Sequence, residues 1–365
     1  MNRALFTSLW QLAEESFRPC AAQADMGGEL DGPVTNNLHL LADHGFLGLS
    51  VPREYGGLGV DLTTQHEYTE ILASACGVTA FTQQQLRTGL KHIVASDNDD
   101  LKRCLLPPLA AGQQFCGVAL SQIRRAGTPL LCAETVPGGF RVNGAIPWIT
   151  AWSLLDGFVL GSVLDDGDRH LFAYVDCKGK ARTSLTASEP LPLIVMRASG
   201  TVSVEVRDLF IPRENMLAVR PREEFLRTDD HEITTHTALP LGCARGCERY
   251  LREMARERGR DDLNEVATAL MFEINHCRRE ALTWDCDCID HPEYKKHALR
   301  ARASAIVLVL RAAHAVVTAG GGGSQFITAT PQRLLREAQF YTNAVQTSDV
   351  QTAVLNQLFS PYFGM

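Results

Sequence analysis

The sequence predicts an α+β protein that is mainly α-helical, with an N-terminal helical domain, a central β-barrel-like domain and a C-terminal four-helix bundle. The hydrophobic periodicity changes twice. Apolar residues recur every three or four positions in residues 1–113, alternate with polar residues in 114–222, and return to helical spacing in 223–365. These changes predict three domains with boundaries near residues 113 and 222.

The N-terminal domain starts with an amphipathic segment. Its apolar residues stand at helical spacing and do not form the continuous stretch of a secretory signal: Leu5, Leu9, Leu12 and Phe17. Further along, residues 44–61 read HGFLGLSVPREYGGLGVD. A short apolar helix end is followed there by glycines at 56, 57 and 59, which suit a backbone turn with positive φ. This segment predicts a tight turn with a structural role.

The central domain shows strand alternation. Its clearest case is the run 202–207, where three valines alternate with Ser203, Glu205 and Arg207. The pairs Gly138-Gly139 and Asn143-Gly144 are typical of hairpin turns, so we expect a short strand from 140 to 142 between them.

The C-terminal region contains four long helical patterns, at residues 239–255, 263–284, 294–318 and 332–359. Helices of this length with alanine-rich faces usually pack as a bundle.

Composition excludes several classes of protein. A hydrophobic fraction of 45% and an aromatic fraction of 7% in 365 residues suit a soluble globular protein with a large core. The net charge of -7 argues against a nucleic-acid or anionic-membrane partner. The longest apolar run, 305–310, is far shorter than a membrane span. Eleven cysteines without a signal peptide predict a reducing, cytoplasmic location.

Four segments carry a resemblance to the acyl-CoA dehydrogenase family. Residues 44–61 resemble a family motif, and GGFRVNGAIPWIT at 138–150 resembles the hairpin that leads into Trp-Ile-Thr. Residues 202–217 resemble the closing strand, and 331–351 resemble the last helix and its following turn. The resemblance follows family order over nearly the whole chain and implies the same three-domain fold. It also implies that a bound FAD accepts hydride from the β-carbon of an acyl thioester while a carboxylate removes the α-proton.

The resemblance implies cofactor-binding residues on three segments. Trp148 and Thr150 match positions that cover the flavin ring and bond its N5 edge, and Thr347 matches a threonine near the ring. Gly322 and Gly323 belong to a glycine turn at the other edge of the cofactor site. Trp148 could instead be a packing aromatic at the barrel rim, and the glycines could be a simple helix C-cap.

The family's acidic, glycine-rich cofactor loop is replaced here by ALSQIRR at 119–125. Ser121, Arg124 and Arg125 are therefore candidate cofactor-binding residues, since arginines supply forked donors to a pyrophosphate or carboxylate. Alternatively, the two arginines are an exposed basic pair. The family's Arg-x-x-Phe-Gly segment in the bundle is also missing, around residues 255–270.

The catalytic base is expected at Glu232. Most family members carry a glutamate in the turn where Val345 stands here, and valine cannot take a proton. Isovaleryl-type relatives carry the base eight residues before a Pro-Leu-Gly, and Glu232 has that spacing to Pro240-Leu241-Gly242. Glu232 could instead be an acidic residue at a helix start, where the helix dipole favours it. His231 and His236 are possible substitutes.

A metal site is not expected, because the Cys-x-Cys spacing of Cys286 and Cys288 is poor for structural zinc. Three functions remain open. The first is dehydrogenation of an acyl thioester on coenzyme A or an acyl carrier protein, with an electron-transfer partner or oxygen as acceptor. The second is a flavin-dependent monooxygenase, which Val345 favours, and the third is a FAD-less binding partner. By resemblance, we expect a homodimer or homotetramer.

Overall fold

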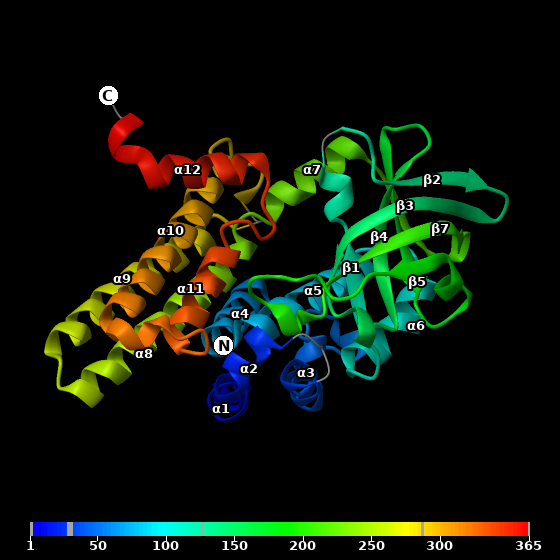
Figure 1. Cartoon of the computed structure of the whole chain (residues 1–365). Helices are drawn as coiled ribbons and strands as arrows, with labels where there is room; N and C mark the ends of the chain where they lie inside the picture. Colours follow the sequence, from blue (N-terminus) through cyan, green and yellow to red (C-terminus); the bar gives the residue numbers. More distant parts are fainter. Residues whose placement is uncertain (1–2, 28–31, 126, 286–287, 364–365) are drawn as a thin grey trace.

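The computed structural model describes residues 3–27, 32–125, 127–285 and 288–363. A helical N-terminal part, a central sheet and C-terminal helices follow one another, which confirms the predicted fold class (Figure 1). The N-terminal helices are α1 (Arg3–Leu12), α2 (Arg18–Met26), α3 (Pro33–Asp43), α4 (Leu62–Ala75), α5 (Gly77–Val94) and α6 (Asp99–Ala110).

The 44–61 segment forms the predicted turn between α3 and α4. Gly56 adopts φ +84° and ends a short 3₁₀ turn, while Gly57 packs so closely that an added Cβ would lie 2.1 Å from the carbonyl oxygen of Val51. Asp61 then caps α4, because its Oδ1 accepts a hydrogen bond of 2.7 Å from the Thr64 amide. The glycines therefore serve backbone geometry, as predicted.

The central domain is one eight-stranded sheet in the order β6-β7-β3-β2-β4-β5-β8, with β1 paired to β4. Within the described residues it stays open, with β6 and β8 at its edges. The strands are β1 (Cys116–Ala119), β2 (Leu131–Val136), β3 (Gly139–Ile149), β4 (Gly157–Leu164), β5 (Arg169–Asp176), β6 (Leu185–Ala187), β7 (Val202–Pro212) and β8 (Met216–Pro221).

One turn prediction in this domain is wrong. Gly138 does turn the chain between β2 and β3, but Asn143-Gly144 lies inside β3 at a shift in its register with β7. Asn143 Oδ1 accepts a hydrogen bond of 2.8 Å from the Asp208 amide. Pairing with a strand about 65 residues away thus makes this dipeptide a bulge.

The C-terminal helices are α7 (Arg222–His231), α8 (Ala238–Arg258), α9 (Asp261–Thr283), α10 (Tyr294–Gly320), α11 (Thr330–Phe340) and α12 (Ser348–Phe363). The stretch predicted as a single helix at 332–359 is two helices, α11 and α12, joined by a turn at 341–347. Val345 in this turn has φ +49°, which no α-helix accommodates. By length and composition alone, the stretch from Tyr294 to Gln325 could cross a membrane, but its buried face packs on α8, α9, α11 and α12.

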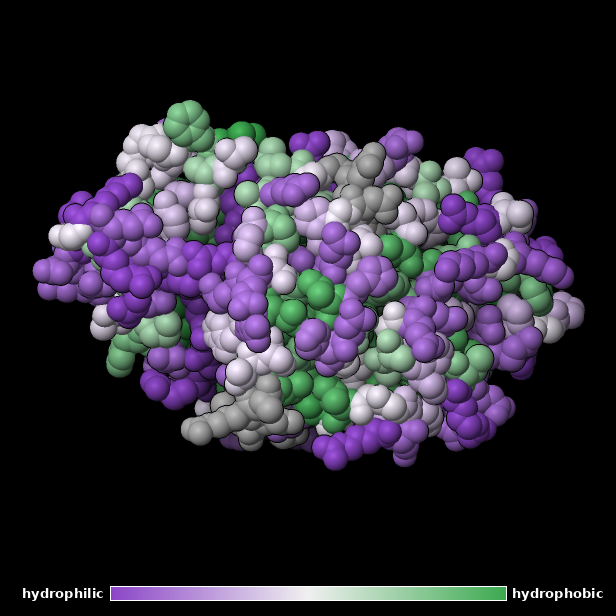
Figure 2. Space-filling model, turned by 90° about the horizontal axis from the view of Figure 1, so that it is seen from below, coloured by the Kyte–Doolittle hydropathy of each residue, from purple (hydrophilic) through white to green (hydrophobic). Residues whose placement is uncertain are grey.

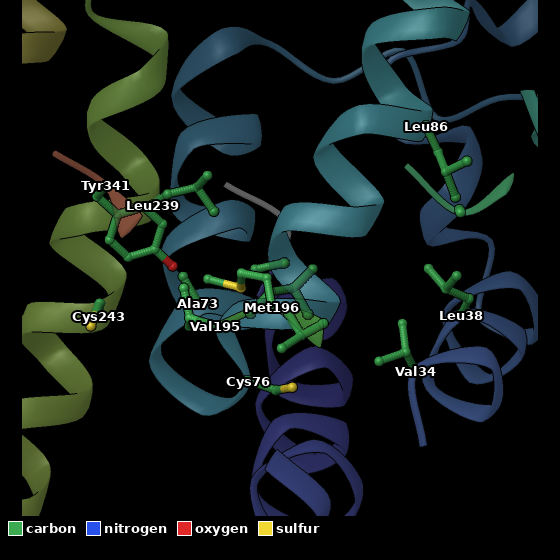
Figure 3. Close-up of a cluster of buried hydrophobic side chains, with 14 of the residues drawn as sticks. Val34, Leu38, Ala73, Cys76, Leu86, Val195, Met196, Leu239, Cys243 and Tyr341 are labelled. Atoms are coloured by element: carbon green, nitrogen blue, oxygen red, sulfur yellow. The ribbon is translucent and has the colours of Figure 1, made fainter. Parts of the chain in front are cut away.

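A single large core joins the three regions. Figure 3 shows Met196 and Val195, from the loop between β6 and β7, among side chains of α3, α4, α5 and α8. Met196 is fully buried, as are Leu38 and Cys243. The face seen from below in Figure 2 is mostly polar, with apolar side chains gathered near its middle.

A buried ion cluster also ties α4 to the bundle. Glu70 on α4 is fully buried and accepts a hydrogen bond of 2.7 Å from Nε of Arg278 on α9. Arg245 on α8 lies 3.5 Å from the other oxygen of the same carboxylate, and His66 Nδ1 lies 3.1 Å from Oε1. One carboxylate therefore links three helices.

Candidate functional site

A small pocket lies where the segment after α7, the turn at 341–347, α10 and the 121–125 loop meet. Long-range packing forms it, because its residues come from four separate parts of the chain. Its lining residues are Arg124, Glu232, Ile233, His236, Arg302, Val345, Gln346, Thr347 and Val350.

Glu232 and Val345 line this same pocket. These are the two positions at which the family resemblance places a catalytic carboxylate, so the fold brings both positions to one place. Only Glu232 has a group that can accept a proton.

Glu232 is already engaged. Its side chain is 24% exposed and accepts a hydrogen bond from the Lys91 ammonium of α5, whose side chain is 55% exposed. The half-exposed lysine therefore competes with a ligand for this oxygen of the carboxylate. The role of Glu232 as base stays a prediction.

His236 is held neutral. Burial is the main cause that lowers its pKa well below the ordinary value, and the positive charges of Arg302 and Arg124 lower it further. Gln84 Nε2 donates to His236 Nδ1 at 3.2 Å, which leaves the ring proton on Nε2. His231 is the last residue of α7, and its side chain lies outside what the structure describes.

Arg302 is a pocket residue that sequence reasoning missed. It is only 3% exposed, and burial lowers its pKa to about 9. Its Nη2 donates to the Ala344 carbonyl at 3.2 Å, while its Nη1 has no partner among the described residues. The signal was present in the sequence: Arg302 stands four residues from both Ala298 and Ile306, on the buried stripe of α10.

The 121–125 loop splits into two environments. Arg124 lines the pocket with its guanidinium 5.4 Å from the Phe225 ring centre, whereas Arg125 is exposed. The Ser121 hydroxyl is shielded from solvent without a hydrogen-bond partner among the described residues. Arg124 and Ser121 thus have surroundings suited to a ligand. Arg125 agrees with the alternative that the arginines are exposed surface residues.

Trp148 and Thr150 do not line the pocket. Trp148 lies on β3 and is 49% exposed, so its indole is available to a ligand. Thr150 is buried, and its Oγ1 is 3.0 Å from Oγ1 of Thr201. Its hydroxyl therefore already has a protein partner.

Thr347 and the glycine turn have separate surroundings. Thr347 lines the pocket and also caps α12, since its Oγ1 accepts from the Val350 amide at 3.4 Å. Gly322 and Gly323 lie after the C-terminal end of α10, where nothing fills the space beside them. Arg302 in the pocket stands 18 residues before the end of α10 at Gly320, which is about 27 Å along the helix, so one chain does not bring these glycines to the pocket.

No group of three or more metal-ligating side chains occurs among the described residues, and Cys286 lies outside them.

Known proteins resemble this chain in sequence and in fold. Residues 2–113 match the family "Acyl-CoA dehydrogenase, N-terminal domain". The 2-methylacyl-CoA dehydrogenase of Solanum tuberosum mitochondria is 25% identical over 372 residues, which cover 96% of this chain and 88% of that protein.

Solved structures share the fold over nearly the whole chain. Butyryl-CoA dehydrogenase from Megasphaera elsdenii superposes with a TM-score of 0.82 at 19% identity, covering 97% of this chain and 98% of that one. Dibenzothiophene monooxygenase from Paenibacillus sp. A11-2 gives a TM-score of 0.80 at 17% identity, covering 99% and 98%.

Proposed function

Because this chain belongs to the acyl-CoA dehydrogenase family, we propose that it is a FAD-dependent oxidoreductase that dehydrogenates an acyl thioester. The thioester would be carried on coenzyme A or on an acyl carrier protein, and electrons would pass to a partner protein or to oxygen. Bound FAD would supply the hydride acceptor.

The observation that carries this proposal is the placement of Glu232. Of the described residues that line the pocket it is the only one with a carboxylate, and Val345 lines the same pocket. In this role, Glu232 would remove the α-proton of the substrate once Lys91 has moved away. Ile233, which is buried, would help to exclude water from that proton transfer.

Two residues of the central domain support the proposal of a bound flavin. The half-exposed Trp148 indole offers a stacking face, and the unpaired Ser121 hydroxyl offers a polar contact. Gly322 and Gly323 would reach a cofactor only from a second copy of the chain, which is the basis for proposing a homo-oligomer. Apolar side chains exposed on the bundle suit such an interface: Phe272, Phe326 and Ile327.

A flavin-dependent monooxygenase is the second candidate. Val345 and Gln346 stand where most family dehydrogenases carry the base, and one structural neighbour is a monooxygenase. In this case Glu232 would not abstract an α-proton, and its removal would leave oxygen-dependent turnover in place.

The visible absorption spectrum of the purified protein, before and after incubation with FAD and gel filtration, is the first test. Retained flavin absorption bands support the dehydrogenase and the monooxygenase hypotheses. A protein that never retains FAD contradicts both hypotheses and favours the FAD-less binding partner.

For a flavin-containing protein, Glu232→Gln is expected to lower the rate of thioester dehydrogenation by about 100-fold or more. Glu223→Gln, on exposed α7, removes the same charge outside the pocket and serves as the control. Equal rates for the two variants would remove Glu232 from the proposal.

A further inference from the structure

Arg302 carries a buried charge that no acidic group balances within the described residues. Arg302 is 3% exposed. Its Nη2 donates a hydrogen bond to the Ala344 carbonyl, and its Nη1 has no partner among the described residues. Burying an unpaired cation is costly, because the charge leaves water without gaining a counter-ion. Such a group therefore indicates a ligand that supplies the missing charge.

The surrounding charges strengthen this indication. Among the described residues that line the pocket, Glu232 is the only acidic one, and Lys91 already pairs with it. The described pocket lining therefore gives Arg302 no balancing negative charge. Tyr341 is also close enough to influence Arg302, but burial raises the pKa of its phenol, which stays neutral at ordinary pH.

Hydrogen-bond donors accompany the charge. Gln346 Nε2 lines the same pocket and has no partner among the described residues. His236 carries its proton on Nε2, as the contact from Gln84 to Nδ1 requires. An anion in the pocket would meet one guanidinium and two neutral donors.

We propose that the substrate carries a carboxylate, distinct from its thioester, and that this carboxylate binds Arg302 with Gln346 and His236 as further donors. The proposal deepens the proposed function and rests on it for the identity of the ligand as a substrate. Phosphate shares the anionic chemistry. A carboxylate is favoured because its two oxygens can accept hydrogen bonds from Nη1 of Arg302 and from Nε2 of Gln346 at the same time.

The first experiment needs no turnover. Thermal unfolding of the FAD-supplemented protein is followed with glutarate, with its neutral diamide glutaramide, and with inorganic phosphate. Glutarate is expected to raise the unfolding midpoint, while the other two do not. An equal rise with phosphate would overturn the assignment to a carboxylate, and no rise with glutarate would overturn the site.

Variants on α10 separate binding from folding. Arg302→Leu should abolish the shift with glutarate while its own midpoint stays equal or rises, because a buried charge is removed. Arg302→Lys should keep part of the shift, and Arg300→Leu, an exposed position paired with Glu280, should keep all of it. A marked drop in the midpoint of unliganded Arg302→Leu would instead show that the contact with Ala344 is the whole role of Arg302.

Thioesters then distinguish this inference from the proposed function. Calorimetry should show that glutaryl-CoA binds about tenfold or more tightly than valeryl-CoA, and Arg302→Leu should reduce the ratio to about one. Equal binding or turnover of both thioesters by the wild type would overturn the carboxylate site while leaving dehydrogenation intact. A glutarate shift in a protein that turns over neither thioester would leave the site standing and contradict the function.

Discussion

Replacement of Glu70 by glutamine is expected to weaken the whole molecule, because this carboxylate holds α4 to the bundle. Glu70 is fully buried against Arg278, Arg245 and His66. Burial alone would raise its pKa, but hydrogen bonds from Arg278 and His66 outweigh it and lower the pKa from 4.5 to about 2.

The pKa shift sets the size of the effect. Each pKa unit is worth about 1.4 kcal/mol, so a fall from 4.5 to about 2 corresponds to roughly 3 kcal/mol of stability at neutral pH. Leaving Arg278 and Arg245 without their counter-ion costs about 3–5 kcal/mol in comparable buried pairs. At about 2.1 cal/mol/K per residue of unfolding entropy, Glu70→Gln should lower the midpoint of this 365-residue chain by about 4–6 °C.

The effect should depend on pH in a defined direction. Because the pKa of Glu70 is depressed in the folded protein, its stabilisation is present above pH 4.5 and is lost as the pH falls from 4.5 towards 2. The difference in midpoint between wild type and Glu70→Gln, measured by differential scanning calorimetry, should therefore be constant near neutral pH and shrink in acid.

Glu273→Gln is the matched control. It removes a carboxylate that pairs with Arg311 on the surface, where the side chains are 42% and 62% exposed, and should cost no more than about 1 kcal/mol. A midpoint of Glu70→Gln within about 1 °C of this control at pH 7, or a difference that does not shrink in acid, would refute the reasoning.

Two further predictions concern backbone geometry, and thermal midpoints check both. Gly57→Ala should destabilise the protein more than Gly56→Ala, because the added Cβ at position 57 would lie 2.1 Å from the Val51 carbonyl oxygen. Gly56 has open space around it, and only its φ of +84° disfavours alanine, by about 1–2 kcal/mol. Equal unfolding midpoints for the two variants would contradict this. Val345→Gly should stabilise by about 1 kcal/mol, since Val345 is a β-branched residue at φ +49°, and a lower midpoint would show that the turn is not strained.

The overall plan of the fold could be predicted from local patterns. Helical spacing, strand alternation and the glycine turn at 56–59 each depend on a few neighbouring residues, and the structure has helices, a sheet and a turn in those places. The family resemblance gave Glu232 and the position of Val345 as the two places where a catalytic carboxylate is found, and both residues line one pocket.

Residues distant in sequence decided the rest. Asn143 is part of a bulge, where its side chain accepts a hydrogen bond from the Asp208 amide. The hydroxyl of Thr150 is hydrogen-bonded to the hydroxyl of Thr201. Arg302 and Lys91 lie at the site because α10 and α5 pack beside it.

The sequence by itself determined the order of the helical and strand regions, because periodicity follows from residues within a few turns of one another. Only the tertiary structure decided that Arg302 has no acidic partner among the described residues and that Glu232 pairs with Lys91. Whether a charge is balanced depends on which groups lie within a few ångströms in space, and helical periodicity carries no information on that.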